Sequence, residues 1–260
     1  MSKTVLITGA SSGIGRELAK LFAADDHNVV LAARRIDVLE NLASELSTKY
    51  KIKAHPMGVD LSQPADIDRF FNDLKRKKIS IDVLVNNAGF GASGSFTEID
   101  FETQLDQIRV NISALTDLTY RLVPGMIKRK SGGIMNIASV AAFSPGPYMA
   151  VYYATKAYVL SFSTALANEL GDKGITVTCV CPGPTKTGFG ERAHVSQNGI
   201  FNTPMVMDVE PVARRAFDGF KSGDELVITG VQNQILALAS RVAPFRLSAY
   251  ITRKFNHRII

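Results

Sequence analysis

Short runs of β-branched and other apolar residues alternate along the chain with longer stretches in which apolar residues recur every three or four positions. The short runs are typical of buried strands, and the longer stretches have the period of amphipathic helices. Their regular alternation indicates crossover units that feed a parallel sheet. The runs predicted as strands are Val5–Ile7, Val29–Ala33, Ala54–Gly58, Val83–Asn86, Ile134–Ser139, Thr176–Cys181 and Leu226–Ile228.

This pattern predicts an α/β fold, a single doubly wound domain with a seven-stranded, mainly parallel sheet and helices on both faces. A long helix is expected over Phe101–Lys130, broken or ended near Pro124, and another over Tyr152–Leu170. Two earlier helices should turn an apolar face to the core, formed by Leu39, Leu42 and Leu46 in one and by Ile67, Phe70, Phe71 and Leu74 in the other.

Length and composition fit one domain over residues 1–260, because 260 residues with 46% hydrophobic content can bury one large core. No stretch approaches the roughly 20 apolar residues of a membrane span, and the amino terminus lacks a secretory pattern. We therefore expect a soluble, cytoplasmic protein. Cys179 and Cys181 alternate on one predicted strand, which favours buried reduced thiols over a metal or redox pair, and no metal site is expected.

Two segments near the carboxyl terminus stand out. Residues 182–211 are rich in Gly, Pro, Thr and Asn and are longer than an ordinary connection, so we interpret them as a substrate lid. The net charge of +6 is concentrated in a basic and apolar tail, residues 231–260, and no acidic residue occurs from Leu226 to Ile260. The basic residues of this tail are Arg241, Arg246, Arg253, Lys254 and Arg258.

The tail allows more than one interpretation. It can form a helix that covers the core or a subunit contact, with its charges solvated. It can also attach the protein to an anionic membrane surface or an acidic partner. Nucleic-acid binding is not expected, because no recognised motif accompanies the charge.

A glycine-rich turn follows the first predicted strand and precedes a helix. Gly9, Gly13 and Gly15 would let backbone N–H groups and the helix dipole face a pyrophosphate without Cβ atoms in the way. The intervening Ser11, Ser12 and Ile14 belong to the same predicted dinucleotide cradle. The spacing departs from the common Gly-x-Gly-x-x-Gly form, so the position after the first strand carries much of the prediction.

The same turn also spells Gly-x-Ser-x-Gly, with Ser11 in the place of a hydrolase nucleophile. A hydrolase would need a histidine nearby, and the candidates His194 and His257 fall in the predicted lid and in the tail. We therefore favour the dinucleotide cradle.

The cofactor type depends on the residues about 20 positions beyond the glycines. An acid there binds a ribose 2′-hydroxyl, whereas an arginine accommodates a 2′-phosphate. Here Ala33 is followed by Arg34 and Arg35, with no carboxylate, so NADP(H) is the predicted cofactor.

Tyr152 and Lys156 stand four residues apart, so on a helix their side chains leave the same face. A phenol has a reference pKa of about 10, and an adjacent ammonium would lower it and make the group a better proton donor and acceptor. Ser139 closes a predicted strand, so its hydroxyl should emerge at the carboxyl edge of the sheet, where parallel sheets bind ligands. Tyr153 would be rotated by about 100° and should serve packing.

From Thr4 to Ile228 the chain resembles the short-chain dehydrogenase/reductase family. The resemblance is carried by Gly9-x3-Gly13-Ile14-Gly15, Asn86-Asn87-Ala88-Gly89, Asn111, Ser139, Tyr152-x3-Lys156 and Pro182-Gly183, in the family's order and approximate spacing. It implies a Rossmann-like domain that transfers a hydride between a nicotinamide and a carbonyl or carbinol carbon. Dimers or tetramers are implied as well, paired through helices over Phe101–Arg121 and Tyr153–Leu170.

The resemblance also implies roles for single residues. Asp60 would contact adenine, although Asp-Leu-Ser is also a good helix-start signal. Lys156 would hold the nicotinamide ribose, and Asn111 would hold a water that extends the proton relay. The backbone at Thr185 and the side chain of Thr187 would meet the carboxamide. The other predicted cofactor-binding positions are Leu61, Asn87, Ala88, Gly89, Val110, Pro182 and Gly183.

The predicted function is NADP(H)-dependent interconversion of a carbonyl and an alcohol, in which Ser139 and Tyr152 hold the oxygen and Tyr152 delivers the proton. A hydrophobic ketone, aldehyde or acyl-type substrate is expected, because the residues predicted to overhang the site are mainly apolar. They are Phe90, Phe143, Pro145, Tyr148, Met149, Phe189 and Met205. The alternatives are a cofactor-binding sensor or scaffold without turnover, and an epimerase or dehydratase that keeps its cofactor bound.

Overall fold

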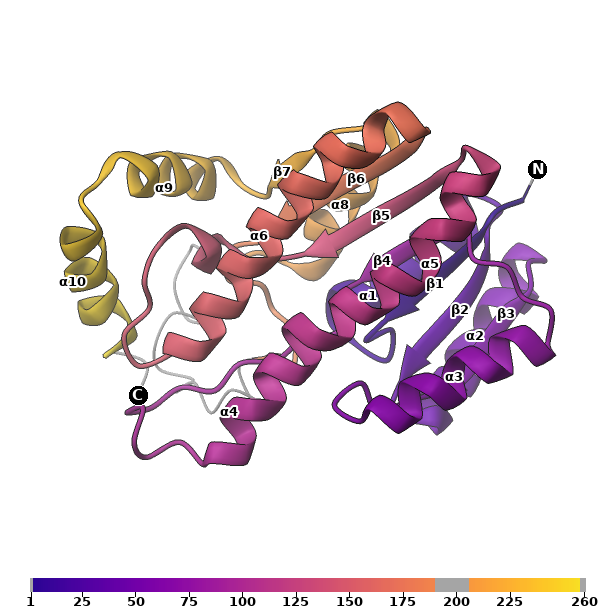
Figure 1. Cartoon of the computed structure of the whole chain (residues 1–260), viewed down its shortest axis with the longest axis horizontal. Helices are drawn as coiled ribbons and strands as arrows, with labels where there is room; N and C mark the ends of the chain where they lie inside the picture. Colours follow the sequence, from indigo (N-terminus) through magenta and orange to yellow (C-terminus); the bar gives the residue numbers. More distant parts are fainter. Residues whose placement is uncertain (1, 190–205, 258–260) are drawn as a thin grey trace.

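A computed structural model describes residues 2–189 and 206–257 as a seven-stranded sheet between layers of helices (Figure 1). The strands are β1 (Thr4–Thr8), β2 (Asn28–Ala33), β3 (Ala54–Gly58), β4 (Val83–Asn86), β5 (Gly132–Ile137), β6 (Ile175–Cys181) and β7 (Leu226–Ile228). They lie in the order β3-β2-β1-β4-β5-β6-β7, and every pair of neighbours is parallel. The predicted α/β fold is therefore confirmed, and all seven predicted strands are present.

Nine α-helices and three shorter helices accompany the strands in the described residues. The α-helices are α1 (Gly13–Ala24), α2 (Ile36–Tyr50), α3 (Pro64–Arg76), α4 (Phe101–Ile108), α5 (Leu115–Arg129), α6 (Ala150–Leu170), α8 (Val209–Ser222), α9 (Val231–Val242) and α10 (Phe245–Asn256). The shorter ones are the π-helix η1 (Arg109–Ala114) and the 3₁₀-helices η2 (Val140–Phe143) and η3 (Gly171–Lys173).

Both faces of the sheet are buried. Successive residues of a strand point to opposite faces, so Val5 and Ile7 pack with α1, α2 and α8, whereas Leu6 packs with α3, α5 and α6. The order of the strands reverses between β1 and β4, which places a ligand-binding crevice at the carboxyl edge of this part of the sheet. The glycine turn and the residues that follow β4 and β5 lie at this edge.

The predicted break near Pro124 is wrong. Pro124 lies inside α5, and Tyr120, whose carbonyl loses its helical donor there, is at the exposed surface, where water can satisfy that carbonyl. The irregularity occurs earlier, in the π-helical turn Arg109–Ala114 that joins α4 to α5. Asn111 lies in this turn and is buried.

Ser139 also departs from its predicted setting. β5 ends at Ile137, and Ser139 is the N-cap of η2, where its Oγ accepts a 3.1 Å hydrogen bond from the Ala141 amide. A cap residue with extended backbone is typical of a helix start. Ser139 is therefore fixed just beyond the edge of the sheet.

The two segments near the carboxyl terminus are described in part. Of the predicted lid, Met205 and His194 lie outside the described residues, and the flanking parts meet where Thr185 pairs with Met207. The tail forms α9 and α10, joined at Pro244. Among the described helices none is long and apolar enough to cross a bilayer.

Candidate active site

Tyr152 and Lys156 occupy adjacent turns on one face of α6, as their spacing predicts. The Lys156 Nζ lies 5.8 Å from the centre of the Tyr152 ring and donates a 2.8 Å hydrogen bond to the Ile137 carbonyl at the end of β5. Ser139, two residues beyond that carbonyl, makes a side-chain hydrogen bond with Tyr152. The three predicted catalytic side chains are thus brought together at the carboxyl edge of the sheet.

The acidity of Tyr152 differs from the prediction. Burial raises the pKa of Tyr152 well above its ordinary value, and the hydrogen bond from Ser139 opposes that rise. Lys156 does not offset this rise; its Nζ lies 5.8 Å from the ring centre and donates to the Ile137 carbonyl. At neutral pH the phenol is therefore protonated and can donate a proton.

Lys156 itself is 6% exposed, and burial lowers its pKa to about 8. Water solvates an ammonium far better than a protein interior does, so burial favours the neutral amine. Lys156 therefore changes charge close to physiological pH.

Asn111 is held rigidly by two segments of the chain. Its Nδ2 donates to the Phe90 carbonyl over 2.9 Å and to Thr155 Oγ1 over 3.0 Å, and its Oδ1 accepts from the Phe90 amide over 3.1 Å. Thr155 Oγ1 in turn donates to the Tyr152 carbonyl over 2.7 Å. The π-helical turn directs Asn111 inward, as such turns do at many functional sites. Thr155, which the sequence did not single out, therefore links Asn111 to the catalytic helix.

Gly89 lies between Asn111 and Lys156. A Cβ at this glycine would be 3.0 Å from Asn111 Oδ1 and 3.4 Å from Lys156 Nζ. The two polar groups thus converge on the same backbone, which is compatible with a relay between them.

The glycine turn is shaped by close approach of the loop after β4. Gly9 has a φ of 66°, and a Cβ at Gly15 would lie 2.3 Å from Asn87 Nδ2. Asn87 uses this nitrogen to bond the carbonyls of Thr8 and Gly9, over 2.8 and 3.3 Å. The buried Thr8 Oγ1 accepts from the amides of Asn87 and Ala88. Sequence reasoning missed Thr8, because a threonine at the end of a strand looks like ordinary packing.

At the open side of the turn, Gly13 has a φ of 56°, and among the described residues only the Thr187 side chain lies within 4 Å of its Cβ position. Ser12 precedes α1 as its N-cap and Ile14 lies in its first turn. The turn therefore presents backbone amides and a helix N-terminus to an anion, which suits a dinucleotide pyrophosphate. A Cβ at Gly13 would fill this space.

Arg35 reaches across to the turn from the loop after β2. Its guanidinium donates to Ser11 Oγ over 3.1 Å and to the Ser11 carbonyl over 3.4 Å. Arg34 is exposed beside it. A guanidinium and a hydroxyl at this point form a donor pair suited to a 2′-phosphate.

Asp60 takes part in a turn before α3. Its Oδ1 accepts from the Ser62 amide over 3.0 Å and from the Ser62 hydroxyl over 2.8 Å. This is the local bonding of an Asx turn, whereas the N-cap of α3 is Gln63. The adenine contact of Asp60 stays a prediction, as do those of Leu61, which packs against the core, and Val110, which lies in η1.

The described start of the predicted lid lies against the glycine turn and Tyr152. Thr185 is buried, and its Oγ1 donates to the Gly183 carbonyl over 2.8 Å. Thr187 Oγ1 accepts from the Phe189 amide, and the Phe189 ring lies 5.2 Å from the Tyr152 ring. Pro182 anchors the segment by accepting from the Val140 amide.

The predicted apolar lining divides into two groups. Phe189 packs on Tyr152, and a Cβ at Gly91 would lie 2.8 Å from the Tyr152 ring, so these two residues border the phenol, whereas the substrate contact of Phe90 stays a prediction. Phe143 instead lies under the Arg241 guanidinium, at 5.2 Å. The participation of Phe143 and Pro145 in substrate binding stays a prediction.

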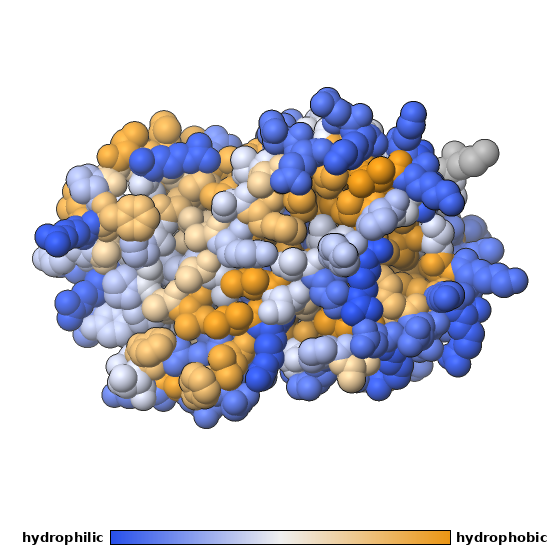
Figure 2. Space-filling view, in the orientation of Figure 1, coloured by the Kyte–Doolittle hydropathy of each residue, from blue (hydrophilic) through white to orange (hydrophobic). Residues whose placement is uncertain are grey.

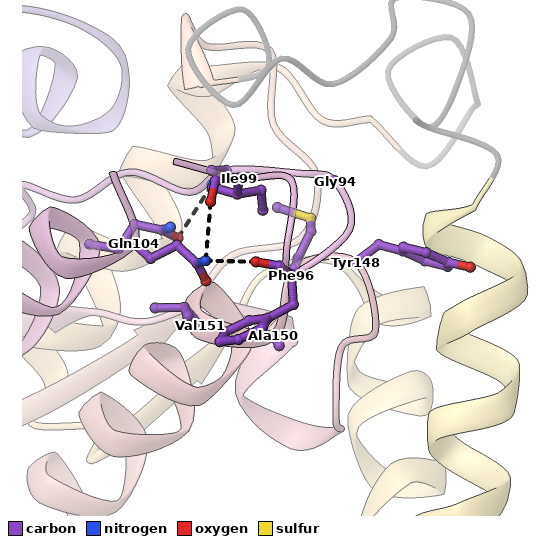
Figure 3. Close-up of a pocket in the computed structure, with 10 residues that line it drawn as sticks. Gly94, Phe96, Ile99, Gln104, Tyr148, Ala150 and Val151 are labelled. Atoms are coloured by element: carbon purple, nitrogen blue, oxygen red, sulfur yellow. Dashed lines mark hydrogen bonds between the residues drawn. The ribbon is translucent and has the colours of Figure 1, made fainter. Parts of the chain in front are cut away.

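A small cavity of about 20 Å³ borders this region, between residues 92–107 and 148–151 (Figure 3). Gln104 holds its outer loop by donating to the carbonyls of Phe96 and Ile99. The buried Met149 contributes to its wall, but Tyr148 points toward α10, where its ring meets His257 at 5.5 Å. Tyr148 therefore joins the site to the tail.

Cys179 and Cys181 lie on β6, below the catalytic residues. Both are buried free thiols, as predicted, with their Sγ atoms 4.0 Å apart. The contact with Cys179, together with burial, raises the pKa of the Cys181 thiol.

Comparison with known proteins agrees with this arrangement. The family model described as short chain dehydrogenase matches residues 3–198. The very-long-chain 3-oxoacyl-CoA reductase of Phaeosphaeria nodorum is 40% identical over 181 residues, which cover 67% of this chain and 52% of that protein. The chain thus spans about half the length of such curated relatives.

Two solved structures are similar over nearly the whole chain. A short-chain dehydrogenase from Sphingobium yanoikuyae in complex with NADPH is 37% identical, with a TM-score of 0.83, and the match covers 91% of this chain and 92% of that one. The bulky-bulky ketone specific alcohol dehydrogenase from Comamonas testosteroni is 35% identical, with a TM-score of 0.78 and 92% of each chain covered. With the sheet order, the glycine turn and the Ser139–Tyr152–Lys156 arrangement, these matches show that the chain belongs to the short-chain dehydrogenase family.

Proposed function

We propose that the protein is an NADP(H)-dependent oxidoreductase that interconverts a carbonyl and an alcohol. The observation that carries the proposal is the position of the protonated Tyr152 phenol, bonded to Ser139 and one helical turn from Lys156. A protein that only binds its ligands has no need for a proton donor such as the Tyr152 phenol at this edge of the sheet. The similarity to dehydrogenases and reductases supports the same activity.

The residues present fit a dinucleotide phosphate. Gly9 and Gly13 adopt positive φ angles, which glycine tolerates, and neither residue places a side chain against a pyrophosphate. Arg35 and Ser11 offer donors for a 2′-phosphate. Structural relatives solved with NADPH or L-sorbose and NADPH support NADP(H) as the cofactor. When bound, the nicotinamide would supply or accept a hydride.

In the direction of reduction, the Ser139 and Tyr152 hydroxyls would hold the substrate carbonyl oxygen. As negative charge develops on that oxygen, both hydrogen bonds strengthen, and Tyr152 transfers its proton. The high pKa of Tyr152 keeps the phenol protonated until the oxygen becomes a stronger base. Lys156, whose pKa lies near 8, would return a proton to Tyr152, and Asn111, which flanks Gly89 with it, would hold a water that resupplies the lysine.

The substrate class follows from what borders the phenol. Phe189 packs on the Tyr152 ring, Gly91 lies beside that ring without a side chain, and Met149 lines the neighbouring cavity. This environment favours a hydrophobic ketone, aldehyde or acyl-type substrate over a sugar or a charged acid.

The experiment that tests this proposal follows NADPH oxidation spectroscopically against ketones, aldehydes and acyl thioesters of increasing chain length. We expect kcat/KM to rise with chain length and to be higher with NADPH than with NADH. Tight NADPH binding without turnover on any member of the panel would instead support a sensor or scaffold.

The predicted assembly is a homodimer or homotetramer, paired through the outer faces of α4, α5 and α6. Exposed apolar residues on α4 and α5 support it, since Phe101 is 69% and Tyr120 is 79% exposed. Light scattering on the purified chain distinguishes the two assemblies from a monomer.

A further inference from the structure

Helix α10 turns its polar residues toward the body of the protein. Ser248 and Asn256 are buried and Thr252 is half-buried, at intervals of four residues that place them along one face. Asn256 fixes this face, because its Nδ2 donates to the Pro147 carbonyl over 2.8 Å and its Oδ1 accepts from the Tyr153 hydroxyl over 3.3 Å. A helix packed on a globular core normally buries its apolar face instead.

The large apolar side chains of α9 and α10 face outward. In α9 the buried residues are Asn233 and Ala237, whereas Ile235 and Leu238 are each 65% exposed. Ten of the 16 exposed large apolar residues in the described chain belong to these two helices. They are Val231, Ile235, Leu236, Leu238 and Val242 of α9, and Phe245, Leu247, Tyr250, Ile251 and Phe255 of α10. We call this set the tail patch.

All the charged residues of α9 and α10 are basic. Arg241 and Arg246 flank the junction of the two helices, and Arg253 and Lys254 lie near the end of α10. No acidic residue occurs anywhere from Leu226 onward. Long basic side chains can keep their stems on apolar surface while the charged ends reach a polar layer.

Both helices lie at one end of the molecule, away from β1, β2 and β3 (Figure 1). In the space-filling view this end shows apolar side chains interrupted by strongly polar ones (Figure 2). An apolar surface of this size on a soluble domain marks a contact site.

We propose that α9 and α10 bind the surface of an anionic membrane, lying in its plane with the tail patch against the lipid. Each helix has 12 residues and is therefore about 18 Å long, too short to cross a bilayer. An amphipathic helix with an apolar face and surrounding basic residues binds anionic lipid in this orientation.

A second copy of the chain fits this surface less well than lipid does. A two-fold symmetric contact through the tail patch would bring together two surfaces whose charged residues are all basic. Like charges repel most strongly when they lose water. Anionic headgroups would instead neutralise them.

The tail patch adjoins the candidate active site. Asn256 bonds Pro147 and Tyr153, and His257 meets Tyr148, so α10 is attached directly to the segment that precedes and begins the catalytic helix. A protein bound through the tail patch would hold this wall of the site close to the lipid. The inference on membrane binding itself does not rest on the proposed reaction.

Sedimentation of the full-length protein with vesicles tests whether its binding to membranes depends on anionic lipid. Vesicles of phosphatidylcholine with about 30% phosphatidylglycerol should bind the protein, more weakly at high salt, whereas pure phosphatidylcholine should bind much less. Replacing Arg246, Arg253 and Lys254 by Gln should weaken binding to the anionic vesicles about tenfold or more. The matched control replaces the exposed Lys75, Lys128 and Lys173 by Gln, and should bind like the unaltered protein. Equal losses in both variants, or equal binding to both vesicle types, would overturn the proposal.

Fluorescence tests which surface enters the lipid, because the chain contains no tryptophan. Phe245→Trp and Tyr120→Trp place single fluorophores at sites that are each 79% exposed, on α10 and on α5. On anionic vesicles with brominated acyl chains, only Phe245→Trp should shift to the blue and be quenched. A response at both sites or at neither would contradict the proposal. So would a shift of Phe245→Trp that follows protein concentration without vesicles, which would show that a second copy covers the patch.

Discussion

The Nζ of Lys156 lies 5.8 Å from the centre of the Tyr152 ring and donates its 2.8 Å hydrogen bond to the carbonyl that ends β5. In this position the ammonium is buried, and its pKa falls to about 8, while burial raises the pKa of Tyr152. Two groups four residues apart are thus shifted in opposite directions by the same cause. At neutral pH the phenol stays protonated, and the ammonium loses its proton more readily than an exposed lysine does.

A pH-dependent stability difference follows for Lys156→Met. In the folded protein the lysine titrates near 8, and in the unfolded chain near 10.5, so between these values the unfolded state binds more protons. Above pH 10.5 the lysine is neutral in both states and does not lower the free energy of unfolding. As the pH falls through 8 the buried amine becomes charged, and that part of the stability is lost. The unaltered protein should therefore gain about 3 kcal/mol relative to Lys156→Met between pH 7 and pH 10.5.

Denaturant unfolding of both proteins across this range measures the difference, and other titrating groups cancel in the comparison. The absolute difference at one pH also includes the lost bond to Ile137, so the pH dependence is the quantity to compare. A difference that does not vary with pH would show that the buried amine keeps its ordinary pKa.

Thr155→Val should lower kcat while leaving NADPH binding nearly unchanged. The valine keeps the shape but removes the acceptor of the Asn111 amide and the donor to the Tyr152 carbonyl. A buried donor left unsatisfied costs about 1–3 kcal/mol, so we expect kcat to fall by about tenfold or more if Asn111 loses its position. Thr155→Ser, which keeps the hydroxyl, should keep the activity of the unaltered protein. Thr164→Val on the same helix, which removes only a bond to Leu160, is the matched control, and an equal loss there would assign the effect to helix stability.

Arg35→Ala should raise the KM for NADPH and have little effect on that for NADH. Arg35 and Ser11 are bonded to each other where a 2′-phosphate would lie, and charge-assisted bonds to phosphate are worth about 1.5–3 kcal/mol, or roughly 10- to 100-fold. The comparison variant is Arg76→Ala, a similarly exposed arginine at the end of α3. Equal changes in the KM for NADPH and for NADH would show that Arg35 does not bind the 2′-phosphate.

Gly15→Ala should destabilise the glycine turn. The added Cβ would lie 2.6 Å from the Gly9 carbonyl oxygen as well as 2.3 Å from Asn87, and a backbone atom cannot easily move away. Overpacking of this kind costs about 1–3 kcal/mol, measurable as a lower Tm and weaker NADPH binding. Gly171→Ala meets nothing within 4 Å and keeps a helical φ of −54°, so its Tm should stay the same or rise. The same loss of Tm in both variants would contradict this account of the turn.

Most of the fold and the candidate catalytic trio could be predicted from the sequence, because they depend on local patterns and spacings. The alternation of strands and helices, the glycines after β1 and the four-residue spacing of Tyr152 and Lys156 all act over short distances. Thr8 and Thr155 could not be found in this way, since their bonds reach Asn87 and Asn111, 79 and 44 residues away. The sequence signal for either is an ordinary buried threonine.

Two other expectations failed, and the role of the tail stayed open, for reasons that a sequence pattern does not contain. The π-helical turn depends on the pairing of Asn111 with Phe90, a tertiary contact. The pKa of Tyr152 depends on enclosure by neighbours such as Phe189. The tail has the composition of an amphipathic helix, but only the structure shows that its polar face is the buried one.

The variant Tyr152→Phe tests the central proposal most directly, because it removes one hydroxyl and retains the ring that packs against Phe189. We expect NADPH binding to be unchanged and kcat for ketone reduction to fall by about 10²–10⁴-fold. Tyr153→Phe, which loses only the bond to Asn256, should keep nearly full activity. When kcat of the two variants is measured side by side, we predict a large loss in Tyr152→Phe alone. Undiminished turnover in Tyr152→Phe would contradict the account.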